Sequence, residues 1–73
     1  MTQTNYNTIA TSQTIEGINK IINQYFYSDI EVRKKVNILT GNKSIFFDLF
    51  NSKGKIDNFY VMKDNRYRFL MKM

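Results

Sequence analysis

One segment constrains the fold of this chain more than any other, because five of its six residues are large and apolar: Ile45-Phe46-Phe47-Asp48-Leu49-Phe50. Such a run is typical either of a strand that is buried on both faces or of part of a buried helix. The short length of the run and its flanks favour the strand, since the turn-forming residues Gly41-Asn42 precede it and Ser52-Lys53-Gly54 follow it. We therefore predict a central strand that needs cover on both of its faces.

The length and the residue types of the chain exclude several classes of protein. The 73 residues are enough for one small domain, which buries only about 60% of the surface that its unfolded chain exposes. The sequence contains no Cys and no His, so it lacks disulfides, thiolate metal ligands, and the commonest metal ligand and general base. It has no apolar segment of about 18 residues, and its first residues do not resemble a signal peptide. We expect a cytoplasmic protein that is not an enzyme, binds no cofactor or metal and does not enter a membrane.

The few carboxylates also argue against catalysis. Asp48 and Asp57 lie on neighbouring predicted strands, but the expected pairing turns them to opposite faces and gives each a Lys partner. Asp29 and Glu31 lie where a helix start favours acidic residues because of the helix dipole. We interpret both pairs as structural.

Positive charge is concentrated in the second half of the chain. Residues 33–73 contain ten Lys or Arg residues against three Asp residues, whereas residues 1–27 contain only Glu16 and Lys20 as charged residues. A basic half predicts an anionic partner, such as a nucleic acid or an acidic protein surface. The alternative interpretation is that the charge keeps a small protein soluble.

The amino-terminal part predicts an arm followed by one amphipathic helix. Residues 1–11 are mostly polar, uncharged and without periodicity, so we expect a flexible arm. From Ser12 to Tyr27 apolar residues recur at helical spacing above a polar opposite side, and Ser12 or Thr14 can serve as the N-cap. Gly17 lowers the helix propensity by up to about 1 kcal/mol, so packing on the sheet must hold this helix.

Residues 28–36 permit two interpretations. Ser28-Asp29-Ile30-Glu31 matches a capping box that could begin a second helix, which would suggest a two-helix DNA-binding unit. The alternation along Val36-Asn37-Ile38-Leu39-Thr40 favours a strand instead. We predict an α+β fold, a single domain over residues 12–73, in which the helix packs on a four-stranded antiparallel meander. The strands are expected near residues 33–40, 44–51, 55–63 and 66–72.

Three turns define the predicted register of the meander. They are a two-residue turn at Gly41-Asn42, a three-residue turn at Ser52-Lys53-Gly54 and a two-residue turn at Asp64-Asn65. A different turn length at Gly54 would exchange the faces of the strands on either side of it. The resulting pairs are Ile38 with Ile45, Val36 with Phe47, Lys35 with Asp48, Phe47 with Phe59, Phe46 with Tyr60, Tyr60 with Phe69 and Asp57 with Lys72.

This register divides the sheet residues between two faces. One face is mostly aliphatic and should be covered by the helix; its members are Val36, Ile38, Ile45, Phe47, Leu49, Phe59, Val61 and Leu70. The other face is rich in aromatic residues, and we expect no obvious cover for it. Its apolar members are Leu39, Phe46, Phe50, Ile56, Tyr60, Met62, Tyr67, Phe69 and Met71.

A large exposed apolar face predicts binding, because soluble monomers seldom expose patches beyond a few hundred Å². The preferred interpretation is a small binding protein that occupies a protein surface, as phage or plasmid inhibitors of host proteins do, or that dimerises symmetrically through this face. The alternative is a single-stranded nucleic-acid-binding module, in which rings stack on bases and cations contact phosphates. A third interpretation is that the arm covers the face and its residues are core. The predicted partner-binding residues are Phe46, Phe50, Tyr60, Met62, Tyr67, Phe69, Lys35, Arg66, Arg68 and Lys72.

Overall fold

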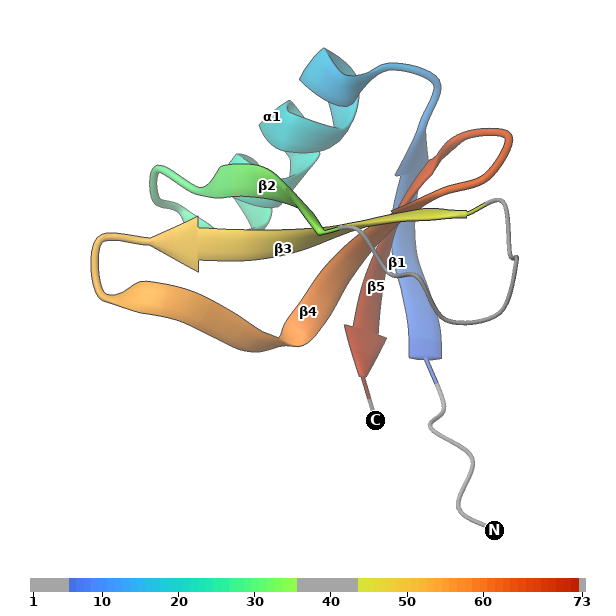
Figure 1. Ribbon diagram of the computed structural model, residues 1–73. Coiled ribbons are helices and arrows are strands. Elements are labelled where there is room, and N and C mark those ends of the chain that lie inside the picture. The colour runs from blue at the N-terminus through green and yellow to red at the C-terminus, as the bar shows by residue number, and fades with distance from the viewer. Residues whose placement is uncertain (1–5, 36–43, 73) are drawn as a thin grey trace, which may run out of the picture.

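The computed structural model describes residues 6–35 and 44–72, the side chain of Lys35 excepted, and these residues form an α+β domain. One helix packs on one side of a five-stranded antiparallel sheet with the strand order β1-β5-β4-β3-β2 (Figure 1). The sheet is strongly twisted, so β3 runs across the direction of β1 and β5. The elements are β1 (Tyr6–Ser12), α1 (Ile15–Phe26), β2 (Glu31–Lys35), β3 (Ile45–Asn51), β4 (Gly54–Lys63) and β5 (Tyr67–Lys72).

The sheet has one strand more than the four that the sequence predicts. The additional strand, β1, is formed by residues that we expected in a flexible arm, and it precedes the helix in the chain. A register shift between Thr8 and Ala10 leaves Ile9 as a bulge, and both Ile9 and Ala10 pack against the core. These contacts, together with the antiparallel ladder to β5, explain why this uncharged segment is extended.

The start of α1 is defined by a side-chain cap. The Thr14 hydroxyl accepts a hydrogen bond from the backbone N–H of Gly17 at 3.0 Å, so the helix begins at Ile15, after the predicted start. Gly17 is explained by a close approach, because a Cβ atom there would lie 2.2 Å from Ser12 Oγ. That same Ser12 oxygen accepts a hydrogen bond from the backbone N–H of Thr14 at 3.3 Å. A larger residue at position 17 would therefore disturb the corner between β1 and α1.

One asparagine ties the end of α1 to the next strand. The chain leaves the helix through Tyr27, whose φ of 52° is in the left-handed region. The side-chain amide of Asn23 donates a hydrogen bond to the Asn19 carbonyl at 2.9 Å, and its oxygen accepts a hydrogen bond from the backbone N–H of Ile30. Ile30 is thereby held in the core, and the chain enters the sheet directly after it.

β2 is a strand, so the second helix and the two-helix DNA-binding unit are wrong. It pairs with β3 such that Lys35 lies opposite Phe46 rather than opposite Asp48. This shift of two residues keeps the predicted faces, because side chains alternate along a strand. The rest of the predicted strand, residues 36–40, and the predicted turn at Gly41-Asn42 lie outside the described residues.

The turn between β3 and β4 contains two residues instead of the predicted three. Gly54 belongs to β4, pairs with Asn51 and has a φ of 124°, a conformation that favours glycine. The shorter turn inverts the faces of the first residues of β4. Ile56 therefore lies opposite Leu49 and packs against the core, not on the aromatic face as predicted.

A bulge in β4 then restores the predicted faces. Asn58 has a φ of 72°, and the register with β3 shifts beside it. Beyond the bulge Phe46 lies opposite Met62 rather than opposite Tyr60. Because the error is again two residues, Tyr60 and Met62 remain on the face on which the sequence places them.

The loop between β4 and β5 contains three residues instead of the predicted two, since Lys63 pairs with Tyr67. The Asp64 carboxylate accepts hydrogen bonds from the backbone N–H groups of Asn65 and Arg66, at 2.7 Å and 3.4 Å. Short Asx-type hydrogen bonds of this kind stabilise a turn locally. The sequence analysis missed the third loop residue because Asp64-Asn65 alone resembles a complete two-residue turn.

The extra loop residue turns β5 over. Phe69 lies opposite Val61, and both side chains are fully buried beneath α1. Tyr67 packs on the same side, whereas Leu70 lies opposite Tyr60 on the other side. The predicted pairs of Tyr60 with Phe69 and of Asp57 with Lys72 are therefore wrong, as is the predicted position of Leu70 on the helix side.

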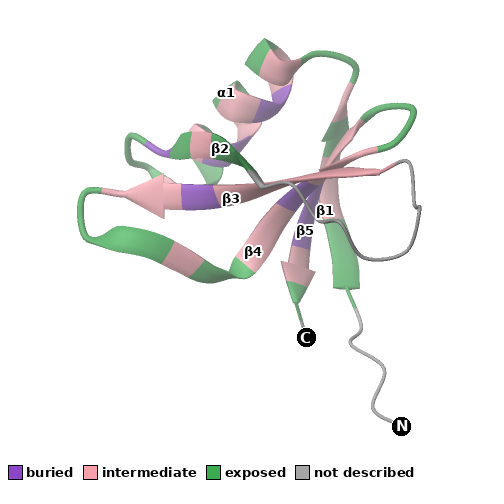
Figure 2. Ribbon diagram, in the orientation of Figure 1, coloured by how far each residue is buried: buried purple, intermediate pink, exposed green. Residues whose placement is uncertain are grey.

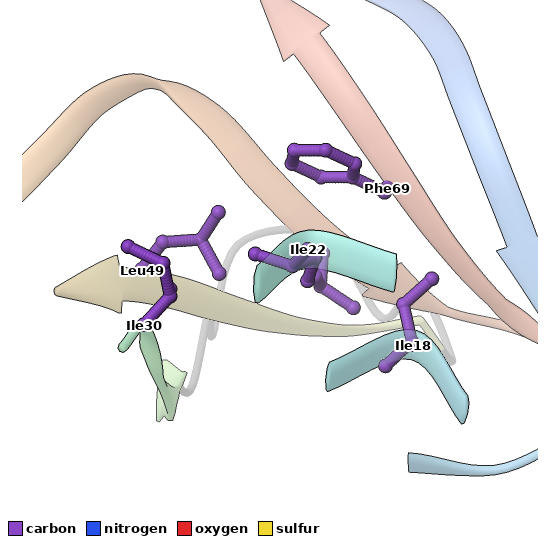
Figure 3. Close-up of a cluster of buried hydrophobic side chains, with 6 residues drawn as sticks. Ile18, Ile22, Ile30, Leu49 and Phe69 are labelled. Carbon is purple, nitrogen blue, oxygen red and sulfur yellow. The ribbon is translucent and has the colours of Figure 1, made fainter. Parts of the chain in front are cut away.

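The core lies between α1 and the sheet, and its buried residues come from α1, from β3, β4 and β5, and from the segment just before β2 (Figures 2 and 3). Its buried members are Ile18, Ile22, Ile30, Leu49, Val61 and Phe69. Rings extend the core at the end of the helix, where Phe26 packs edge-on against Phe59 with ring centroids 5.0 Å apart. The predicted helix-side positions of Phe47, Leu49, Phe59 and Val61 are confirmed. Within the described ranges, no helix is long and apolar enough to cross a membrane.

Candidate binding face on the outer side of the sheet

The side of the sheet that faces away from α1, called the outer face below, carries large apolar side chains from the two central strands. In β3, Phe46 and Phe50 alternate with residues that pack in the core, so they point to the outer face. In β4, Tyr60 and Met62 flank the buried Val61 in the same way. All four are only partly exposed. Phe46, Phe50, Tyr60 and Met62 are called the four anchors below.

Two predicted anchors do not belong to this face. Phe69 is completely buried on the helix side, and Tyr67 packs against the core there, because the three-residue loop turns β5 over. Their predicted placement on the aromatic face is therefore wrong. Arg66 lies in that loop and is exposed, and the side chain of Lys35 lies outside the described residues.

β5 contributes two of the predicted cations and one apolar residue to the outer face. Arg68 lies opposite Met62, and Lys72 lies opposite Tyr6 of β1. Leu70 sits between these two cations and is only 6% exposed. The predicted combination of apolar anchors and basic residues therefore exists on this face, with fewer rings than the sequence suggested.

Arg33 is a candidate site residue that the sequence analysis did not identify. Its guanidinium lies 4.1 Å from the centroid of the Phe50 ring and donates a hydrogen bond to the Glu31 carboxylate at 2.9 Å. This hydrogen bond and the positive charge of Arg33 lower the pKa of Glu31, and the hydrogen bond raises the pKa of Arg33. The sequence signal for Arg33 was its spacing of two residues from Glu31. This spacing places both side chains on one face of the sheet, but only if the strand begins at Glu31.

Three carboxylates on or beside the outer face are each paired with a cation. Asp48 lies opposite Tyr60 in the middle of the face, and its Oδ2 is 3.7 Å from Lys55 Nζ, which replaces the predicted pairing with Lys35. Arg68 donates a hydrogen bond to Asp64 of the adjoining loop. The cations outnumber the carboxylates, so the face has a net positive charge. The cations are Arg33, Lys55, Arg66, Arg68 and Lys72, and the carboxylates are Glu31, Asp48 and Asp64.

Neighbouring groups hold two of the rings in place. The Tyr6 ring meets the Tyr60 ring edge-on, with centroids 5.8 Å apart and an angle of 80° between the planes. Phe50 is covered from one side by the Arg33 guanidinium. β1 and β2, the strands at the two ends of the sheet, therefore each contribute one residue that limits the exposure of the central rings.

Polar groups line the hollow beside this face. A hollow of about 320 Å³ lies at the β4–β5 loop and is lined by Gln13, Asp64, Asn65, Arg66 and Arg68. Such a lining suits water or a polar group better than an apolar ligand. In the parts of the chain that the structure describes, no three His, Cys, Asp or Glu side chains are grouped so that they could hold a metal ion.

Comparisons with protein-family models, with curated proteins and with solved structures found no match to this chain. The function must therefore be inferred from the chemistry of the outer face itself.

Proposed function

We propose that this protein is a non-enzymatic binding protein that covers an acidic region of a partner protein with the outer face of its sheet. The observation that carries the proposal is the combination, on one face, of partly exposed apolar anchors with an excess of cations. Phe, Tyr, Met and Arg are the residue types enriched at the centres of protein interfaces. The mode of action would be steric, as in an inhibitor that blocks a surface used by another molecule.

Apolar burial would supply most of the binding free energy. Each anchor retains exposed apolar area that a partner can cover, at about 25 cal/mol per Å² removed from water. Phe50 and Tyr60 are already held by Arg33 and Tyr6, so they lose little side-chain freedom when a partner binds. A prearranged face of this kind binds more tightly than its area alone would indicate.

The cations would select the partner. Charges around an apolar centre steer association with a surface of the opposite sign and disfavour like-charged surfaces. Lys72 and Arg66 are exposed at the margin of the face, so they should act mainly on the association rate. A partner with acidic residues around an apolar patch fits this arrangement.

Binding of single-stranded nucleic acid is supported less well by the same geometry. A base stacks on an open ring face, but the Arg33 guanidinium lies over Phe50 and Tyr6 contacts Tyr60. Of the three rings among the four anchors, Phe50 and Tyr60 are therefore already engaged within the protein. For this reason we prefer a protein partner.

A retention experiment with matched variants tests the proposal. Phe46→Ala/Tyr60→Ala removes two anchors, while the control Tyr27→Ala removes a ring that is 93% exposed at the end of α1, away from the outer face. We expect a protein from the source organism's lysate to be retained by the wild type and by Tyr27→Ala. Once purified, that protein should bind the double variant at least about tenfold more weakly. Circular dichroism must show that both variants are folded.

Salt dependence separates the two kinds of partner. Each phosphate that a cation neutralises releases counterions, so oligonucleotide binding weakens steeply with salt, whereas an apolar protein interface responds weakly. Titration of a fluorescent single-stranded oligonucleotide at two salt concentrations provides the comparison. Micromolar, salt-sensitive binding that disappears in Tyr60→Ala would contradict a protein partner. Equal weakening by Tyr27→Ala would show that the outer face is not the binding site.

A further inference from the structure

The two outermost strands of the described sheet differ in how they are protected against other strands. β2 contains four charged residues among five: Glu31, Arg33, Lys34 and Lys35. Charged side chains on an edge strand discourage the addition of another strand, because a second edge would have to desolvate or oppose them. The charges of β2 therefore disfavour the addition of another strand at this edge of the sheet.

β1 lacks such charges, and its one irregularity is the bulge at Ile9. Its seven residues, Tyr6–Ser12, include no charged residue and no Pro, and they include the β-branched Thr8, Ile9 and Thr11. An edge strand presents a row of backbone N–H and C=O groups that can pair with another strand. Tyr6, one of the large hydrophobic residues that stay exposed, lies on this strand and is 48% exposed.

We propose that β1 is a self-association edge, at which two copies of the chain pair antiparallel and form one continuous sheet. In a two-fold symmetric contact the same patch meets itself, so the patch must be compatible with its own charge. β1 fulfils this condition because it is neutral, and Thr–Thr pairs across strands are favourable. β2 does not fulfil it, since its cations would meet each other.

This contact leaves the outer face open. The two-fold axis of an antiparallel strand pair is perpendicular to the sheet, so the outer faces of both copies lie on the same side. The dimer would thus present two sets of anchors next to each other, whereas the sequence analysis expected the anchors themselves to be buried in the dimer. The edge pairing does not depend on the proposed function of the outer face, and the two can fail separately.

Sedimentation velocity over a range of concentrations tests the edge. Thr8→Lys/Thr11→Lys places two positive charges on β1, and the control Gln24→Lys/Ser52→Lys adds the same charge at exposed positions on α1 and in the β3–β4 turn. We expect the wild type and the control to reach the dimer mass at high micromolar concentration. The dissociation constant of the dimer should be at least about tenfold higher for the edge variant, because like charges then face each other across the contact.

Cysteine crosslinking locates the contact without adding charge. The chain contains no Cys, so a single cysteine at Asn7, Thr8 or Thr11 can form a disulfide only between copies. In a two-fold antiparallel pair only the residue at the axis lies opposite its own copy, within the roughly 4.4–6.8 Å between Cα atoms that a disulfide needs. Oxidation should therefore give covalent dimers at the one position nearest the axis, and Gln24→Cys should give none. A monomer mass for the wild type at every concentration would overturn the proposal. So would a dimer that survives in the edge variant but dissociates in Phe46→Asp.

Discussion

The two faces of the sheet both carry large apolar side chains, but these side chains are buried to different extents. On the helix side, Leu49, Val61 and Phe69 are completely buried. On the outer face, Phe46 and Phe50, which lie in β3 like Leu49, remain partly exposed. Only the helix side receives cover from α1, whose buried Ile18 and Ile22 pack on it.

This difference teaches that apolar content does not distinguish a face that the helix covers from one that it leaves exposed. The interior strand β3 is apolar on both sides, and the chain has a single twelve-residue helix among its described elements to cover it. The side that the described residues leave without a covering helix is stabilised by ion pairs, a cation–π contact and one ring contact with β1. Those interactions keep the rings in place without burying them, which is the condition for a binding face.

Truncation of a helix-side ring should cause the largest loss of stability. Phe69→Ala leaves a cavity in the middle of the core, where the side chain contacts Phe59 and Tyr25 at ring-centroid distances of 5.5 Å and 5.3 Å. We expect the free energy of unfolding to fall by about 3–5 kcal/mol, as for other buried phenylalanines. In a marginal domain this loss could prevent folding altogether. Urea denaturation followed by circular dichroism measures it.

Removal of the link between α1 and β2 should have an intermediate effect. Asn23→Ala leaves the backbone N–H of Ile30 without the side-chain oxygen that accepts its hydrogen bond, and Ile30 is buried. We expect a loss of about 1–3 kcal/mol in the same denaturation experiment. The neighbouring exposed residue provides the control, since Gln24→Ala should change stability by less than about 0.5 kcal/mol. Equal effects of the two substitutions would mean that Asn23 does not hold the helix on the sheet.

Truncation of an outer-face ring should cost little stability and should weaken partner binding. Phe46 is partly exposed and lies outside the core cluster, so Phe46→Ala should lower the free energy of unfolding by about 1 kcal/mol. The ratio between this loss and that of Phe69→Ala measures how different the two faces are. A loss of more than about 3 kcal/mol would show that the outer face is a second core, covered in a way that the described residues do not reveal.

A substitution at the end of α1 should slightly increase stability. Tyr27 has a left-handed backbone conformation that favours glycine, and its exposed ring covers neither face of the sheet. We expect Tyr27→Gly to raise the free energy of unfolding by about 0.5–1 kcal/mol, as measured by a shift in the urea midpoint. Tyr27→Ala, which keeps a Cβ atom, should give no such gain. A gain with both substitutions would attribute the effect to the ring rather than to the backbone.

The predictability of the fold varied with the type of signal. The periodicity of Ile15, Ile18 and Ile22 indicated the helix. The alternation of β3 placed Phe46 and Phe50 on one face of the sheet and Phe47 and Leu49 on the other. Of the candidate site, the four anchors lie on the face that the sequence indicated, whereas Arg68 and Lys72 reach that face only because the longer loop turns β5 over. The predictions of the helix and of the two sides of β3 succeeded because they depend on residues close in the chain, whose side-chain directions follow from local geometry.

The remaining predictions failed where a turn contains one residue more or fewer than expected, because this exchanges the two faces of the strand that follows. One additional loop residue beside Asp64 moved Tyr67 and Phe69 from the predicted site to the helix side. At Gly54 a turn that is one residue shorter moved Ile56 into the core, and the bulge at Asn58 reversed the change further along β4. Errors of two residues, as in the pairing of Lys35, left the faces intact.

The sequence by itself determined the α+β composition, the presence of one amphipathic helix and the presence of a strand that is apolar on both sides. Tertiary structure alone decided that Tyr6–Ser12 joins the sheet as β1, which turn lengths are used and therefore which rings are buried. The physical reason is that the free-energy differences between turns are smaller than the free energy of burying one ring. Alternative turns differ by amounts on the order of 1 kcal/mol, whereas the burial of one phenylalanine contributes about 1.5–3 kcal/mol. The packing of Phe69 under α1 can therefore select a loop that the local sequence does not favour.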